Sequence, residues 1–174
     1  MIELVNYDSD WPTMFAVAAA ELRRIEPAWL IEHMGSTSVP GLIAKPLIDI
    51  AVRRTGEGDV DRHRASLEEL GWSLNAGGPA NRVTFVRRDA AGNRTHHAHF
   101  FRPELWEGAN QRIFRDWLLT HDDERELYAA AKRAAAAESV DGADYTKRKT
   151  AVVQQITNRA RAARGLPPVD VWEK

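Results

Sequence analysis

The 174-residue sequence contains no cysteine. Disulfide bonds and thiolate chemistry are therefore excluded. The lack of cysteine also weakly favours a location in the reducing cytoplasm. The first eleven residues have neither the basic region nor the apolar region of a secretory signal. No run approaches the roughly 18 apolar residues of a membrane span. We therefore expect a cytoplasmic location and no membrane partner.

The sequence also lacks an excess of charge of either sign, because 24 basic and 25 acidic side chains give a net charge of −1. Without a strongly basic surface, a nucleic-acid partner is not expected, although a local patch can still attract an anion. A composition of 44% hydrophobic and 28% charged residues is that of a globular protein. The length suits one domain with a helical appendage. The oligomeric state is left open by the sequence.

Apolar periodicity divides the chain into a mixed part and a helical part. Helices are expected over about residues 11–26, 38–44, 59–70, 104–119, 122–138 and 142–164. Strands are expected over about residues 28–34, 47–52, 72–74, 82–88 and 94–101, with a hairpin turn over 89–93. The pattern predicts an α+β fold, in which a mixed sheet of four or five strands carries helices on one face and is followed by a helical C-terminal subdomain.

The boundaries follow from the same pattern. Residues 1–102 are expected to form the α/β core and residues 103–165 the helical subdomain packed on it. The proline-rich residues 166–174 are expected to be a loose tail.

A run of small residues lies between the first two expected strands. Gly35 is followed by Ser36, Thr37 and Ser38, whose hydroxyls and main-chain N–H groups can hold an anion. The same residue types also suit ordinary turns and helix N-caps, so by themselves they do not distinguish a phosphate site from a turn.

Asp49 is the single acid in an otherwise apolar strand. Alternation places it on one face with Leu47 and Ala51, while branched aliphatic residues occupy the other face and should pack against helices. The face of Asp49 is therefore expected to be open. A carboxylate in such a strand needs a partner, which is either a metal ion or a cation such as Lys45.

His97 and His99 alternate on the last expected strand. Their side chains should stand about 7 Å apart on one face, a distance that one transition-metal ion can bridge with modest adjustment. With Asp49 as a remote carboxylate, the pair matches a two-histidine, one-carboxylate site or a mixed zinc site. The alternative is a solvated, histidine-rich edge strand. His33, on the first strand, is expected to be packed rather than to be a ligand.

The last expected helix carries basic residues without acids. From Tyr145 to Gly165 there are six basic residues and no acid, so this helix can attract phosphate. Lys149 falls on the stripe of this helix that should face the body of the protein, where an ammonium needs an anion. Tyr128 and Lys132 form a second pair at helical spacing.

The string HMGSTSVPGLIAKPLIDI, at residues 33–50, resembles the GrpB family, a branch of the nucleotidyltransferase superfamily that shares its fold with polymerase-beta-like enzymes. The resemblance extends from about Val5 to Ala163. It includes Tyr7-x3-Trp11-x3-Phe15, the segment Phe114–Leu118 and Tyr145-x3-Lys149. It implies a nucleotidyltransferase-like fold.

The resemblance also implies a nucleotide site and a metal site. ATP or another nucleoside triphosphate would be held by Gly35, Ser36, Thr37, Ser38, Lys45, Arg115, Lys132, Tyr145 and Lys149. Asp49, His97 and His99 would be the catalytic residues and would bind a divalent metal, magnesium or manganese, with zinc as an alternative. The superfamily usually carries a second acid two residues after the first, where this chain has Ala51.

Three functions are compatible with these features. The first is metal-assisted transfer of a nucleotidyl group to a small-molecule acceptor, with pyrophosphate as the leaving group. The second is a nucleotide- or ligand-binding module that has lost catalysis, which Ala51 favours. The third is a metal-dependent hydrolase or oxygenase built on the two histidines and the aspartate, which the nitrogen ligands favour.

Overall fold

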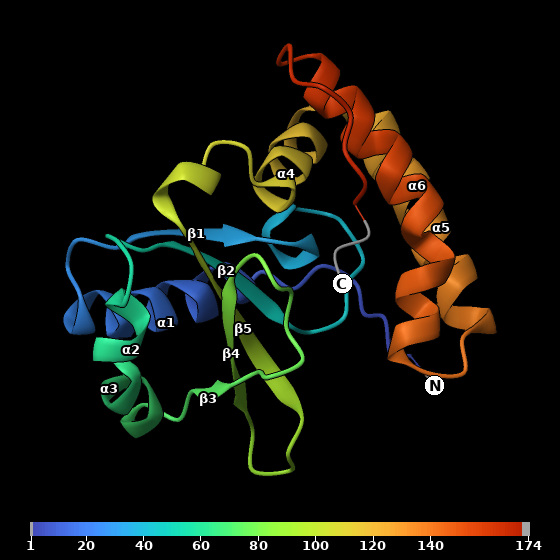
Figure 1. Cartoon of the computed structure of the whole chain (residues 1–174). Coiled ribbons are helices and arrows are strands. Elements are labelled where there is room, and N and C mark those ends of the chain that lie inside the picture. The colour runs from blue at the N-terminus through green and yellow to red at the C-terminus, as the bar shows by residue number, and fades with distance from the viewer. Residues whose placement is uncertain (1, 172–174) are drawn as a thin grey trace.

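A computed structural model describes residues 2–171 and contains one five-stranded mixed sheet. The strands lie in the order β1-β2-β5-β4-β3, and only β2 and β5 run parallel (Figure 1). They are β1 (Leu30–Met34), β2 (Ile48–Arg53), β3 (Ser73–Leu74), β4 (Val83–Arg88) and β5 (Arg94–Phe101). The α+β fold with a mixed sheet is therefore confirmed.

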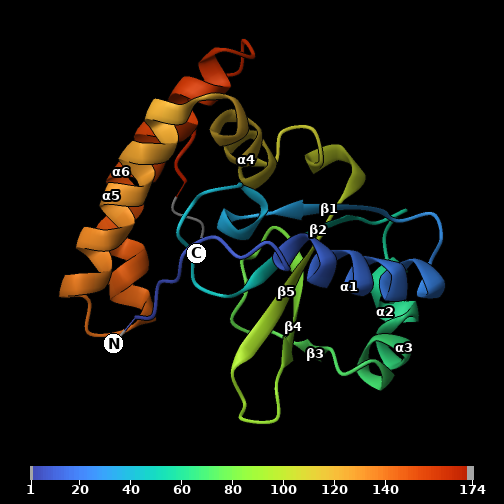
Figure 2. The ribbon, with the colours of Figure 1, turned by 180° about the vertical axis from the view of Figure 1, so that it is seen from behind.

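One face of the sheet is covered by three helices, α1 (Trp11–Ile25), α2 (Asp59–Arg62) and α3 (Arg64–Glu69). Figure 2 shows α1 lying across this face. The branched residues Ile48, Ile50 and Val52 are fully buried in the core cluster on this side. The alternation expected for β2 is thus correct, and Asp49 points to the opposite face.

Among the described residues, one expected helix is absent, one begins later than expected, and the one expected over residues 59–70 is divided into α2 and α3. The helix expected near residues 38–44 does not form. The chain has a short 3₁₀ turn at the start of this segment instead, η1 (Ser36–Ser38). Ala44 instead exchanges two main-chain hydrogen bonds with Val5, which requires extended backbone. The helix expected over 104–119 begins only at Asn110, because Trp106 turns into a buried cluster with Phe101.

In the part of the chain that the structure describes, three α-helices follow the last strand: α4 (Asn110–Thr120), α5 (Asp122–Glu138) and α6 (Gly142–Ala162). Both views show α5 and α6 side by side as an arm next to the sheet (Figures 1 and 2). Val39 and Leu42, in the connection from β1 to β2, pack into a cluster with residues of all three helices. Within residues 2–171, none of the helices combines the length and apolar character that a bilayer crossing needs.

The segment after α6 is not loose over the part that the structure describes. Residues 166–171 return along α6, where Gln154 bonds the main chain of Val169 and Val171 at 2.6 and 3.0 Å. Arg161 also donates to the carbonyl of Pro167 at 2.7 Å. Side-chain hydrogen bonds to main-chain groups fix this segment although it has no periodic pattern. Residues 172–174 of the expected tail lie outside the described residues.

Candidate functional site

The turn after β1 is built around the carboxylate of Asp49. Gly35 has a φ of 73°, which side chains other than glycine rarely adopt. A Cβ placed on Gly35 would collide with the carboxylate of Asp49 and would lie 2.9 Å from its Cβ. Glycine is therefore required here for both its conformation and its lack of a side chain.

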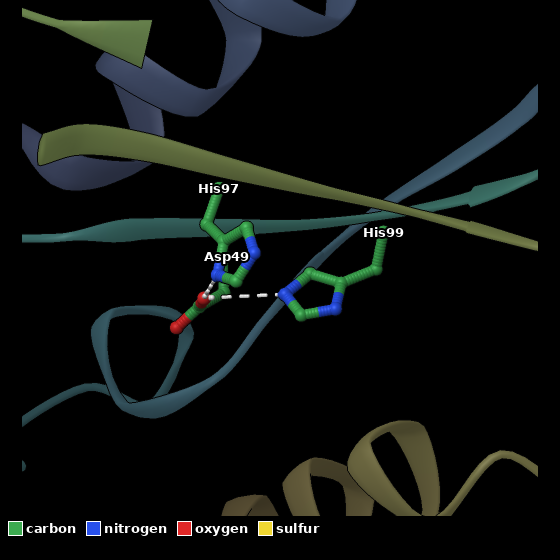
Figure 3. A group of neighbouring side chains, drawn as sticks. All are labelled: Asp49, His97 and His99. Carbon is green, nitrogen blue, oxygen red and sulfur yellow. Dashed lines mark ion pairs between the residues drawn. The ribbon is translucent and has the colours of Figure 1, made fainter. Parts of the chain in front are cut away.

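Asp49, His97 and His99 form one compact group, which we call the Asp49 cluster. The parallel register of β2 and β5 pairs Asp49 with His97 and Ala51 with His99. One carboxylate oxygen, Oδ1 of Asp49, lies 3.8 Å from Nδ1 of His97 and 3.7 Å from Nε2 of His99 (Figure 3). The side chains thus face one another from adjacent strands.

Burial controls the protonation of the cluster. It lowers the pKa of His97 to about 3, although the carboxylate of Asp49 acts in the opposite direction. The same burial raises the pKa of Asp49 above its ordinary value. His97 is therefore neutral at pH 7 and has a lone pair available for a ligand.

The cluster fits a divalent ion in spacing and charge. Ligand atoms about 2.1 Å from a tetrahedral ion are separated by roughly 3.4 Å, close to the 3.7 and 3.8 Å seen here. Two imidazoles with one carboxylate suit zinc, manganese or iron better than magnesium, which prefers oxygen. Asp49, His97 and His99 would hold the ion.

One contact opposes metal binding at His99. Nε of Arg82 donates to Nδ1 of His99 at 3.1 Å. A neutral imidazole that accepts at Nδ1 carries its proton on Nε2, the nitrogen that faces Asp49. Ligation through Nε2 therefore requires the contact with Arg82 to break. Arg82 had no signal in the sequence, because it reaches His99 only through the pairing of β4 with β5.

A cavity of about 180 Å³, which we call the lysine cavity, opens beside Asp49. It is lined by Ser36, Lys45, Leu47, Asp49, Lys132, Tyr145, Thr146 and Lys149. The three lysines come from the connection before β2, from α5 and from α6. Within residues 2–171 none of the three has a carboxylate at ion-pair distance.

Aromatic rings hold the ammonium groups in place. Nζ of Lys45 and of Lys149 lie 4.6 and 4.9 Å from the centre of the Tyr145 ring. Lys132 is only 2% exposed and donates to the carbonyl of Ile43 at 2.5 Å. Burial and the neighbouring Lys149 lower the pKa of Lys132 to about 7. The charged forms of three lysines this close together repel one another, and a bound anion would stabilise them.

The small-residue turn contributes one hydroxyl to the cavity rather than three. Ser36 lines the cavity, and its hydroxyl has no hydrogen-bond partner among the described residues. Thr37 is buried and donates to the carbonyl of Leu47 at 3.1 Å. Ser38 donates to the carbonyl of Gly35 at 2.6 Å. The hydroxyls of Thr37 and Ser38 thus shape the turn and are already engaged.

Arg115 lies beside a second, larger cavity and is already paired. Its guanidinium contacts the carboxylates of Glu32 and Asp116 and donates to the carbonyl of His33 at 2.7 Å. His33 itself stacks on Phe15, with ring centres 4.8 Å apart, and burial lowers its pKa to about 4. His33 is packed, as expected, and Arg115 joins α4 to β1 instead of facing the lysine cavity.

Ala51 lies on the same side of the sheet as Asp49, but this end of the face is covered. Ala51 is fully buried in a cluster with Met34, Phe101 and Trp106. The expectation of an open face therefore fails at Ala51, because the chain after β5 folds over it.

The larger cavity, of about 210 Å³, shares Ser36, Thr146 and Lys149 with the lysine cavity. Its other walls come mainly from α4, α5 and α6, with Phe114 and Tyr128 among them. No pattern in the sequence predicted this cavity, because helical periodicity does not reveal where two helices diverge.

The chain is similar in sequence and fold to known proteins. The GrpB protein family model matches residues 1–159. The chain is 39% identical over 174 residues to UPF0157 protein PA4798 of Pseudomonas aeruginosa, covering 97% of this chain and 71% of that protein. The crystal structure of conserved protein GrpB from Enterococcus faecalis has a TM-score of 0.81 at 28% identity, covering 94% of this chain and 99% of that chain.

A more distant structure is similar in fold alone. Terminal uridylyl transferase 4 from Trypanosoma brucei, solved with bound dUTP, has a TM-score of 0.58 at 11% identity, covering 92% of this chain and 56% of that chain. The fold is thus nucleotidyltransferase-like, and the extent of the sequence match shows that the chain belongs to the GrpB family.

Proposed function

We propose that the protein binds ATP or another nucleoside triphosphate and transfers its nucleotidyl group to a small-molecule acceptor in the cytoplasm. The observation that carries this proposal is the convergence of Lys45, Lys132 and Lys149 on one cavity beside Asp49. Lys45 and Lys149 are cations, and a bound anion would keep the third lysine, Lys132, protonated, so the cavity suits a polyanion of several charges.

In this proposal the triphosphate occupies the lysine cavity. Lys45 and Lys149 neutralise its outer oxygens, while Ser36 donates a hydrogen bond from the turn. Lys132 is too buried to move far and fixes the charge at the base of the cavity. The larger cavity, which shares Ser36 and Lys149, takes the nucleoside.

The transfer itself needs charge stabilisation more than a protein nucleophile. A hydroxyl of the acceptor forms a bond to the α-phosphorus, the bond from that phosphorus to the bridging oxygen breaks, and pyrophosphate leaves while the proton of the acceptor passes to solvent. A divalent ion held by Asp49, His97 and His99 supplies Lewis-acid charge next to the phosphates when bound. The lysines stabilise the charge of the departing pyrophosphate.

The relatives support a nucleotide as ligand. The structure of the uridylyl transferase of Trypanosoma brucei contains dUTP, and its fold is similar to that of this chain. At 11% identity the similarity concerns fold only, so the choice of base is not transferred.

A binding module without catalysis is the second candidate. Ala51 stands where a second metal-binding acid is usual in the superfamily, and its burial leaves no room for a carboxylate. In that case the same cavity binds a nucleotide, or another polyanion, and releases it unchanged.

A thermal-shift screen of the four nucleoside triphosphates, crossed with magnesium, manganese and zinc, tests the proposal, because a ligand of the native state raises the melting temperature. The control is Lys147→Gln, an exposed lysine on the same helix as Lys149. A shift that Lys149→Gln removes and Lys147→Gln retains supports nucleotide binding. Release of pyrophosphate in the presence of an acceptor supports transfer, and release of inorganic phosphate supports the metal-dependent hydrolase. If the protein binds a nucleotide and releases neither product, the binding module is supported.

A further inference from the structure

We propose that the protein has a second metal site, formed by Glu26, Asp59 and His63, which we call the Asp59 cluster. Nε2 of His63 lies 3.4 Å from Oε2 of Glu26 and 3.6 Å from Oδ1 of Asp59. The three ligand atoms all lie within 4.8 Å of one another. The cluster is separate from the Asp49 cluster and plays no part in the nucleotide site.

A break in local structure brings the imidazole into place. Periodicity predicts one helix over residues 59–70, and no glycine or proline interrupts that segment. In the structure the helix is broken at His63, which lies between α2 and α3 with a φ of −102° and a ψ of 6°. A departure from local propensity is expected where a functional arrangement needs it. Here the break directs the ring of His63 toward both carboxylates.

Hydrogen bonds orient each carboxylate so that one oxygen faces the histidine. Oδ2 of Asp59 accepts from Nε1 of Trp29 at 2.7 Å and from the main chain of Thr55 at 2.8 Å. Oε1 of Glu26 accepts from the main chain of Ala28 at 2.9 Å. The other oxygen of each group is directed at His63. Outer hydrogen bonds of this kind fix the ligands in metal sites.

The charge of the cluster also calls for a cation. Asp59 is fully buried, and the carboxylates of Asp59 and Glu26 together carry two negative charges. The competing cation is Arg62, whose Nη2 lies 3.4 Å from Oδ1 of Asp59. The side chain of Arg62 is 63% exposed and can turn into solvent. Two oxygens and one nitrogen, with water completing the shell, suit Zn²⁺ or Co²⁺.

The ion would act as a structural link. Glu26 follows the last residue of α1, whereas Asp59 begins α2. A metal bound by these residues would join the two helices that cover one face of the sheet, and its binding energy would add to the stability of the folded state.

The test removes the Asp49 cluster first, so that its outcome does not depend on the proposed function. In the His97→Asn/His99→Asn variant, titration with Zn²⁺ and the visible absorption of Co²⁺ are expected to report one bound ion without any nucleotide. Adding His63→Asn should weaken that binding at least about tenfold. Glu26→Gln can keep the hydrogen bond to Ala28 and should also weaken metal binding. It provides a second test in case the variant with His63→Asn does not fold.

Circular dichroism establishes that each variant is folded. The His97→Asn/His99→Asn variant should also melt at a higher temperature with Zn²⁺ than without it, and His63→Asn should abolish this increase. Absence of Zn²⁺ and Co²⁺ binding in the variant that lacks only the Asp49 cluster would overturn the proposal. Binding that survives both His63→Asn and Glu26→Gln would overturn it as well.

Discussion

The Asp49 cluster and the Asp59 cluster are built from the same kinds of ligand, but the first adjoins a cavity lined by lysines and the second does not. In both clusters the ligand atoms lie within 4.8 Å of one another. Three lysines and a cavity adjoin Asp49, whereas Asp59 is fully buried and bonded to Trp29 and Thr55. The ligands alone do not determine the role of such a cluster, because what surrounds them decides whether an ion can meet a substrate.

The largest effect is expected from Ala51→Asp, which tests whether the Asp49 cluster can be completed with a second acid. Ala51 is fully buried beside Met34, Phe101 and Trp106, so the new carboxylate would have no partner. We expect a loss of about 3 kcal/mol or more in the free energy of unfolding, measured by denaturant titration.

Ala51→Ser is the control, because it adds a small polar group without a charge. If Ala51→Asp leaves stability unchanged and tightens Mg²⁺ binding, position 51 faces the metal site and the burial argument is wrong.

The second-largest effect is expected from Lys149→Gln, which tests whether nucleotide binding at the lysine cavity is independent of metal binding at the Asp59 cluster. Loss of one charged hydrogen bond to a phosphate is expected to weaken triphosphate binding roughly 10- to 100-fold in a calorimetric titration. Metal binding at the Asp59 cluster should not change. Equal weakening by the exposed Lys147→Gln would mean that general positive charge, and not the cavity, attracts the nucleotide.

The third prediction uses the lowered pKa of Lys132, about 7. Triphosphate binding favours the protonated ammonium, so affinity should fall several-fold as the pH rises from 6.5 to about 8.5. Stability of the ligand-free protein should move in the opposite direction. Above pH 7 the unfolded chain holds a proton on Lys132 that the folded chain has lost, so this residue's contribution to stability rises with pH.

Lys132→Met serves as the comparison for the pH effect. Its affinity for triphosphate should be weak and nearly independent of pH over the same range. A steep pH dependence that persists in Lys132→Met would assign the titration to another group.

The smallest effect is expected from Arg82→Met, which addresses the contact that disfavours metal binding at His99. Without the donor at Nδ1, His99 can place its proton there and free Nε2 for an ion. We expect Zn²⁺ affinity at the Asp49 cluster to rise a few-fold in a variant that carries His63→Asn. Arg94→Met removes a nearby positive charge without touching His99 and is the control. If both variants change the affinity equally, charge and not the proton position is responsible.

The sequence predicted those parts of the fold that depend on local periodicity. The alternation of β2 correctly separated Asp49 from Ile48 and Ile50, and the same argument put His97 and His99 on one face. The prediction of a helix near residues 38–44 was wrong, because residues 39–41 form a bend and a turn and a long-range bridge to Val5 holds Ala44 in extended backbone.

The site contains features that no local pattern encodes. The hydroxyls of Thr37 and Ser38 donate to the carbonyls of Leu47 and Gly35. These bonds depend on the three-dimensional path of the chain around Asp49. Arg82 reaches His99 through strand pairing, and Glu26 meets His63 through helix packing. Contacts between residues this far apart in the chain become predictable only when the topology is known.

The most direct test of the central claim is a calorimetric titration of the wild type and of Lys45→Gln/Lys149→Gln with each of the four nucleoside triphosphates in the presence of Mn²⁺. The lysine cavity predicts one-to-one binding of at least one nucleotide to the wild type and an affinity at least about 100-fold lower in the double variant. Equal affinity in both proteins, or no binding of any nucleotide to the wild type at millimolar concentration, would contradict it.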